Sequence, residues 1–101
     1  MTMPEQINLV NLQTAAKQAC DLLKTLANPH RLLLLCQLTQ GEYSVGELEA
    51  TTGIRQPTLS QQLSVLREEQ TVNARREGKQ IFYSIANQKA LAVLQVLHRL
   101  D

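Results

Sequence analysis

Residues 44–69 read SVGELEATTGIRQPTLSQQLSVLREE, and two short helical segments can be recognised within them. The first begins at Ser44, which has Glu47 three residues later, the spacing of a capping box. It ends at Gly53, the residue type that most often terminates a helix. This half of the stretch therefore predicts a helix of about eight residues followed by a turn.

The second segment has the spacing of an amphipathic helix. Leu59, Leu63 and Leu66 recur at helical intervals and form a buried stripe, and Pro57 lies near the first turn. A short helix, a turn containing Gly and a second helix with an open polar face is the helix-turn-helix arrangement. We therefore predict a helix-turn-helix over residues 44–70.

The polar face of this second helix carries uncharged amide and hydroxyl groups where Lys and Glu would be ordinary. Gln can pair bidentately with adenine, and Ser or Thr can donate to phosphates or base edges. The N-terminal part of a recognition helix is the part that meets the bases. A solvated polar face is the plain alternative for this helix taken alone. If the helix-turn-helix binds DNA, the residues of it that we expect to contact the duplex are Ser44, Arg55, Gln56, Thr58, Ser60, Gln61, Gln62 and Arg67.

The hydrophobic period changes to two after this helix. Apolar residues alternate on both sides of a turn at 77–79, namely Val72 and Ala74 before it and Ile81, Tyr83 and Ile85 after it. This pattern predicts a β-hairpin over residues 72–85, placed as a wing. Arg75, Arg76 and Lys79 gather near its tip, where cations neutralise phosphates or enter a minor groove.

The remaining segments read as helices. Residues 5–27 and 88–100 have apolar residues at helical spacing, and Asn28-Pro29 is an N-cap followed by a preorganised first position for a helix over 29–40. The expected order is four helices, a hairpin and a last helix. We predict one mainly α winged helix-turn-helix domain over residues 1–101.

Composition sets the class of protein. The 101 residues are 44% hydrophobic, as in a packed soluble domain, and no apolar run approaches a membrane span of roughly 20 residues. The first residues do not resemble a secretory signal, so we expect a cytoplasmic protein with reduced thiols and no membrane partner.

The charge is distributed unevenly along the chain. Residues 1–50 hold three Lys/Arg against five Asp/Glu, net −2, and residues 51–101 hold seven against four, net +3. The basic surface is therefore expected in the C-terminal half.

Three segments carry a resemblance to a known family: ANPHRLLLLCQL (27–38), SVGELEATTGIRQPTLSQQLSVLRE (44–68) and ARREGKQIFYSI (74–85). They resemble the ArsR/SmtB family of bacterial winged-helix repressors, and within it the BigR/HlyU/SqrR branch. The resemblance implies a homodimer joined through residues 5–27 and 88–100, and a double-stranded operator with an inverted repeat. The apolar character of both terminal helices independently allows such a dimer.

Two positions depart from the pattern of this family near the DNA. Residue 70 is Gln where Gly often ends the recognition helix, so a non-Gly residue is expected to take that turn. Residue 55 is Arg where Ser is frequent, which leaves Gln56 as the expected N-cap of the helix. Arg55 then adds a candidate phosphate contact.

Two metal sites are familiar in proteins of this family, and this sequence lacks the ligands of both. Residues 43–49 hold no Cys, and residues 87–101 offer only His98 and Asp101. Zinc takes about four ligands, so no metal and no cofactor are expected.

Cys36 matches the Cys of the second helix in this branch, where oxidation or persulfide chemistry with a Cys near the end of the last helix switches DNA binding. Here that second Cys is absent, and Cys20 is the only other thiol. If the two helices form a hairpin, Cys20 and Cys36 lie at matched distances from the bend and become candidates for a bridge. A plain packing role for both thiols in the core is the alternative.

The sequence therefore favours a DNA-binding repressor with an oxidant or persulfide as candidate effector. A DNA-binding anti-repressor without an effector and a winged-helix protein-interaction module remain the alternatives. An enzyme is not expected, since His30 and His98 have no nucleophile or carboxylate constellation around them in the sequence.

Overall fold

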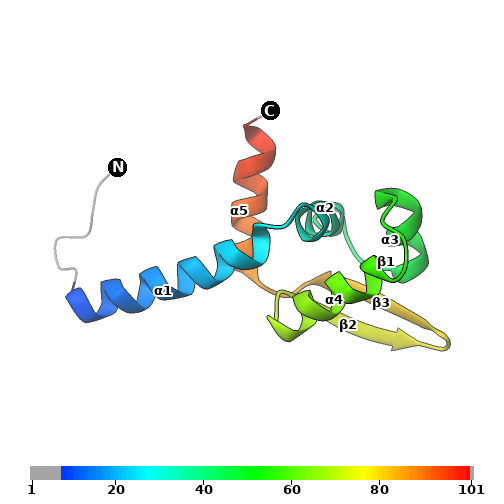
Figure 1. Ribbon diagram of the computed structural model, residues 1–101, viewed down its shortest axis with the longest axis horizontal. Helices are drawn as coiled ribbons and strands as arrows, with labels where there is room; N and C mark the ends of the chain where they lie inside the picture. The colour runs from blue at the N-terminus through cyan, green and yellow to red at the C-terminus, as the bar shows by residue number, and fades with distance from the viewer. Residues whose placement is uncertain (1–7, 101) are drawn as a thin grey trace.

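The computed structural model describes residues 8–100, in which five helices and three strands follow one another (Figure 1). Their bounds are α1 Leu9–Leu26, α2 Pro29–Leu38, β1 Tyr43–Ser44, α3 Val45–Thr52, α4 Thr58–Glu68, β2 Val72–Glu77, β3 Gln80–Ile85 and α5 Gln88–Arg99. The predicted winged helix-turn-helix is confirmed, and β1 is an element that the sequence did not reveal.

The helix boundaries follow local capping chemistry. Asn28 caps α2, with its Oδ1 accepting a hydrogen bond from the Arg31 backbone N–H at 3.1 Å and Pro29 in the first turn. The helix ends at Leu38 rather than at residue 40, because the next amides bond three residues back in a tighter turn. Helix α1 begins at Leu9, and the predicted start at residue 5 lies outside the described residues.

The helix-turn-helix has the predicted ends. Ser44 and Glu47 form the capping box of α3, and Gly53 closes that helix with a left-handed φ of 74°. After α4, Gln70 adopts a φ of 58°, so a non-Gly residue does take this turn, as predicted. The Gln70 and Thr71 amides bond back to carbonyl groups in the last turn of α4, which is the Schellman pattern.

The sheet has the order β1-β3-β2, and both pairings are antiparallel. In the wing, Val72 pairs with Ile85 and Glu77 with Gln80, leaving a two-residue turn at Gly78 and Lys79. The third strand, β1, is only two residues long and pairs with β3. A two-residue strand has no periodicity to read, which is why it was missed.

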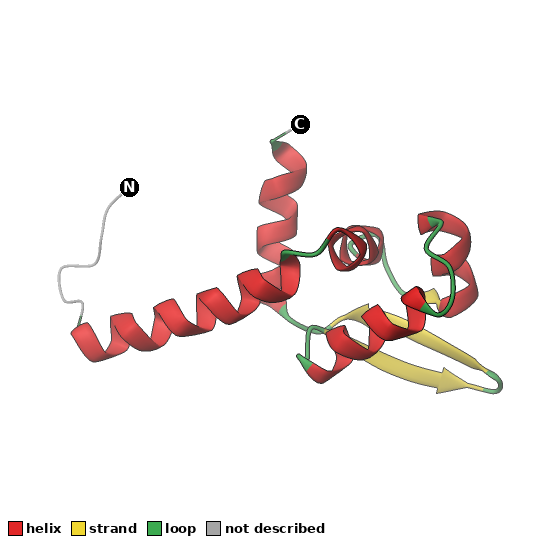
Figure 2. Cartoon of the chain, viewed as in Figure 1, coloured by secondary structure: helices red, strands yellow, loops and turns green. Residues whose placement is uncertain are grey.

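The core lies between α2, α3, α4, α5 and the inner face of the sheet. Its fully buried leucines are Leu34, Leu35, Leu48, Leu59, Leu63, Leu66 and Leu94, and Tyr83 closes it from β3. In contrast, α1 extends away from this core, with only Thr25 and Leu26 buried at its end (Figure 2). No helix within residues 8–100 is both long enough and apolar enough to cross a bilayer.

Candidate nucleic-acid interface

Helix α4 presents a polar face opposite its buried leucines. Leu59, Leu63 and Leu66 are buried, and the exposed positions on the other side include Ser60, Gln61, Ser64 and Arg67. Ser64 was missed in the sequence, although it follows Gln61 by three residues and so shares its face. The face carries hydroxyl and amide groups with a single cation near the end.

The turn before α4 holds two more of the predicted residues. Gln56 is exposed, and its Oε1 accepts a hydrogen bond from the Ser60 backbone N–H at 3.0 Å, so it satisfies an otherwise free amide of the first turn. The N-cap residue itself is Pro57, without a side-chain bond, which corrects the expected position by one residue. Arg55 is exposed in this turn, and Thr58 is half-buried.

Gln62 is not freely available on this face. It is half-buried, and its Oε1 accepts a hydrogen bond from Arg31 Nη1 at 3.1 Å. Bidentate pairing with adenine needs the oxygen and the nitrogen of the amide together. Gln61, one residue earlier and exposed, is therefore better placed to read a base.

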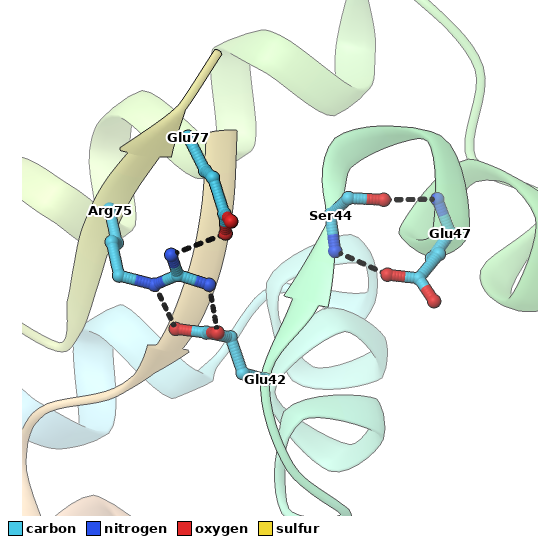
Figure 3. A network of polar contacts seen from close by, with 5 residues as sticks. All are labelled: Glu42, Ser44, Glu47, Arg75 and Glu77. Carbon is cyan, nitrogen blue, oxygen red and sulfur yellow. Dashed lines mark hydrogen bonds and ion pairs between the residues drawn. The ribbon is translucent and has the colours of Figure 1, made fainter. Parts of the chain in front are cut away.

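Ser44 is corrected from a DNA contact to a structural residue. It is 8% exposed, its Oγ accepts from the Glu47 backbone N–H at 3.1 Å, and its own N–H donates to Glu47 Oε1 at 2.9 Å (Figure 3). A buried hydroxyl occupied in a capping box does not reach a phosphate. Its contribution to the site is to fix the start of α3.

Arg75 is held by neighbouring side chains instead of projecting freely from the wing. Its Nη2 lies 2.7 Å from Glu42 Oε1 and its Nη1 lies 2.7 Å from Glu77 Oε2, with Nε 3.2 Å from Glu42 Oε2 (Figure 3). The guanidinium also covers the Phe82 ring, 4.7 Å from its centroid. The hydrogen bonds that Arg75 donates to the two carboxylates raise the pKa of Arg75, and the bonds accepted from Arg75 lower the pKa of Glu42.

Glu42 had no signal in the sequence that would have found it, because it lies 33 residues from Arg75. The two come together because β1 and β2 both pair with β3, where Ser44 and Arg75 are each opposite Phe82. We refer to Glu42, Arg75 and Glu77 as the wing clamp. The clamp neutralises the charge of Arg75, which was expected to serve the DNA.

The two other basic residues of the wing are exposed at its tip. Arg76 Nε donates to the Gly78 carbonyl at 3.3 Å, and Lys79 occupies the turn itself. Gly78 takes a left-handed φ of 62°, which its lack of a side chain allows. Helix α4 packs against β2, so the polar face of α4 and this basic tip belong to one connected unit (Figure 1).

The two cysteines are free and exposed. Cys36 borders a cavity of about 480 Å³ between α2 and α5, together with Leu33, Leu94, His98 and Arg99. Burial raises the pKa of the Cys36 thiol, which lowers the fraction of reactive thiolate. Neither thiol is packed in the core of the single chain, which was the alternative role considered for both.

Helices α1 and α2 do not form the antiparallel hairpin that a bridge was expected to need. In Figure 1, α1 runs across the view and α2 is seen along its axis, so the helices cross steeply. The argument that places Cys20 and Cys36 at matched distances from the bend requires two antiparallel helices, so this arrangement does not support a bridge.

Among residues 8–100, no three His, Cys, Asp or Glu side chains gather closely enough to hold a metal ion.

Comparison with known proteins places these features in a family. The family described as "Bacterial regulatory protein, arsR family" matches residues 28–74, which span α2 to the first half of β2. The biofilm growth-associated repressor of Agrobacterium fabrum is 56% identical over 93 residues, covering 92% of this chain and 80% of the repressor.

Solved structures match most of the chain. The transcriptional repressor BigR from Xylella fastidiosa superposes with a TM-score of 0.86 at 48% identity, covering 93% of this chain and 96% of that one. The homodimeric winged helix-turn-helix DNA-binding domain of Mb0332 from Mycobacterium bovis gives a TM-score of 0.75 at 31% identity, covering 97% and 89%.

Proposed function

The chain belongs to the arsR family of bacterial regulatory proteins, and we propose that it represses transcription by binding an inverted-repeat operator as a homodimer. The observation that carries this proposal is the exposed amide and hydroxyl face of α4 beside a basic wing tip. The repressor and the homodimer named among its relatives support the same reading. Regulation of this kind requires binding and no catalysis.

The two parts of the interface have different tasks. Gln61, with Ser60 and Ser64 beside it, reads base edges in the major groove, where an amide distinguishes adenine from the other bases. Arg76 and Lys79 at the wing tip contact phosphates or the minor groove and supply affinity without choosing a sequence. Arg55, before α4, and Arg67, in its last turn, hold the two ends of the helix to the backbone of the duplex.

The dimer is built on α1. This helix has 18 residues, and an isolated helix of that length is only marginally stable in water. Its apolar residues recur at alternating intervals of three and four, the spacing of a coiled-coil seam, at Leu9, Leu12, Ala16, Ala19 and Leu23. Leu9 is 66% exposed and Leu23 is 55% exposed in the single chain. A second copy of the chain covers this seam.

The last helix, α5, adds a second apolar surface. Val96 is 53% exposed, Leu97 41% and Leu100 75%, and Leu33 of α2 is 45% exposed. Large exposed apolar patches of this kind mark association surfaces. Two long helices from each protomer therefore form the dimer and leave both recognition helices free.

The experiment that tests the proposal is a selection of binding sequences from a pool of random double-stranded DNA. A dimeric reader enriches an inverted repeat with half-sites about one helical turn apart. The control is the double variant Gln61→Ala/Arg76→Ala, which should stay dimeric in sedimentation and enrich nothing. A pool that shows no enrichment with the wild-type protein would contradict the proposal and favour a protein-interaction module.

A thiol response is a second candidate, favoured by the position of Cys36 beside His98 and Arg99 in the cavity between α2 and α5. A persulfide donor would transfer its outer sulfur to the Cys36 thiolate, leaving a Cys36 persulfide and releasing the donor as a thiol. The raised pKa of Cys36 makes this reaction slow at neutral pH.

Intact mass and operator affinity, measured before and after treatment with an organic persulfide, test this candidate. The expected result is a gain of one sulfur atom at Cys36 with weaker DNA binding, abolished by Cys36→Ser and preserved in Cys20→Ser. An unchanged mass, or a changed mass with unchanged affinity, would leave the protein as a DNA-binding regulator or anti-repressor without a thiol effector.

A further inference from the structure

The side chain of Arg31, in α2, contacts two other helices of the fold. It belongs to the first turn of α2, and its Nε donates to the Thr25 carbonyl at 2.7 Å. Its Nη2 donates to the Lys24 carbonyl at 3.1 Å and its Nη1 to Gln62 Oε1 at 3.1 Å. One guanidinium thus joins the end of α1 to the middle of α4.

The contacts with α1 complete the end of that helix. The last four carbonyls of a helix have no partner within it. In α1, the Leu23 carbonyl accepts from the Ala27 amide and the Leu26 carbonyl from the Asn28 amide. Arg31 supplies the donors for the two carbonyls between them, and its charge is favourable at the negative end of the helix dipole.

The contact with α4 falls on the recognition helix itself. Gln62 lies next to Gln61, the proposed base reader, and one turn after Thr58. Because Gln62 is 31 residues from Arg31, this is a tertiary contact between α2 and the helix proposed to read DNA. The same guanidinium also reaches the end of α1, the helix proposed to dimerise. The planar fork of arginine suits this task, because it fixes three acceptors in one rigid geometry.

We infer that Arg31 is a positioning residue that sets the distance and the angle between the two recognition helices of the dimer. This inference rests on the proposed function. The α1 seam fixes the two-fold axis, and Arg31 with Gln62 fixes α4 relative to α1 within each protomer. The Arg31–Gln62 contact therefore determines which half-site spacing the dimer accepts, and it does so without touching DNA.

The test uses the inverted repeat selected with the wild-type protein and duplexes in which its spacer is one base pair longer or shorter. Adding one base pair rotates one half-site against the other by about 34°. The wild-type protein should prefer its selected spacing about tenfold. Arg31→Lys and Gln62→Met should reduce that preference to about threefold or less, whereas Gln62→Glu, which keeps an acceptor for Arg31, should retain it.

The matched control is Gln61→Met, which changes the neighbouring residue without touching Arg31. It should lose affinity for every duplex while keeping the wild-type spacing preference. A wild-type spacing preference in folded, dimeric Gln62→Met would overturn the inference, even if Arg31→Lys proves too unstable to measure. Failure of the proposed function is a different outcome, since the wild-type protein would then select no inverted repeat at all.

Discussion

Arg75 and Glu42 form a bidentate ion pair, in which Nη2 lies 2.7 Å from Oε1 and Nε lies 3.2 Å from Oε2. The pair ties the wing to the loop before β1, and Glu77 completes the wing clamp from the same strand as Arg75. The wing is thus oriented by a cation that was expected to contact DNA. Arg76 and Lys79 are the exposed cations of the wing that we propose to contact DNA.

Releasing this clamp should strengthen the electrostatic attraction to DNA. In Glu42→Gln the charge of Arg75 is balanced by Glu77 alone, and Arg75 becomes available for a phosphate. The slope of log affinity against log salt should steepen by about 0.9, the value for one additional phosphate contact. Fluorescence anisotropy with a random-sequence duplex measures it, and Glu49→Gln, an exposed acid of α3, is the matched control. An equal slope in both variants would show that Arg75 stays on Phe82 and away from DNA.

The clamp should also respond to acid. The hydrogen bond from Arg75 lowers the pKa of Glu42, so the ionised pair persists below the ordinary Glu value of about 4.3. A lowered pKa in the folded state contributes stability above the unfolded value, and this contribution is lost as the pH falls through the folded value. Titration of the Glu42 carboxyl carbon by NMR should show the lowered pKa in the wild type and the ordinary one in Arg75→Gln. Identical titration curves in the two proteins would contradict the contact.

Charges placed in the apolar seam of α1 should convert the dimer into a monomer. Leu12→Asp with Leu23→Asp places four charges in the interface of the dimer, and their desolvation cost is not compensated. Sedimentation equilibrium should then give the 11.3 kDa monomer, with operator affinity lost. Gln13→Asp, on α1 but outside the seam, should remain a dimer. A dimer that survives the double substitution would place the interface elsewhere.

Gln70 predicts a stabilising substitution. Its φ of 58° is left-handed, a conformation that costs a residue with a Cβ about 1–2 kcal/mol. Gln70→Gly removes this strain from the folded state. Glycine also increases the conformational entropy of the unfolded chain, which offsets part of the gain, so the free energy of unfolding should rise by about 0.5–1 kcal/mol. Urea denaturation measures the change. Glu69→Gly, at a neighbouring φ of −79°, should instead lower the stability.

Local signals accounted for most of the fold. Asn28-Pro29, the Ser44–Glu47 capping box and Gly53 each act within a few residues, and the structure has all three where the sequence placed them. The leucine stripe of α4 was readable for the same reason, because periodicity is a property of one segment. Prediction succeeded where the physical cause lay inside a single element.

Contacts between distant segments escaped the sequence. The partners in the pairs Arg75–Glu42 and Arg31–Gln62 are 33 and 31 residues apart. No local sequence pattern around one partner predicts the other. Two predicted DNA contacts, Arg75 and Gln62, are engaged by other side chains of the fold in this way. The steep crossing of α1 and α2 likewise depends on packing, which is why the matched-distance argument for Cys20 and Cys36 did not hold.

The most direct test of DNA recognition is an anisotropy titration of the selected inverted repeat at several salt concentrations, beside the same duplex with one half-site scrambled. We predict that affinity falls steeply and linearly on a log–log plot with salt, and that the intact repeat binds at least about a hundredfold more tightly than the scrambled one. Equal affinity for the two duplexes, or affinity insensitive to salt, would contradict a sequence-reading dimer.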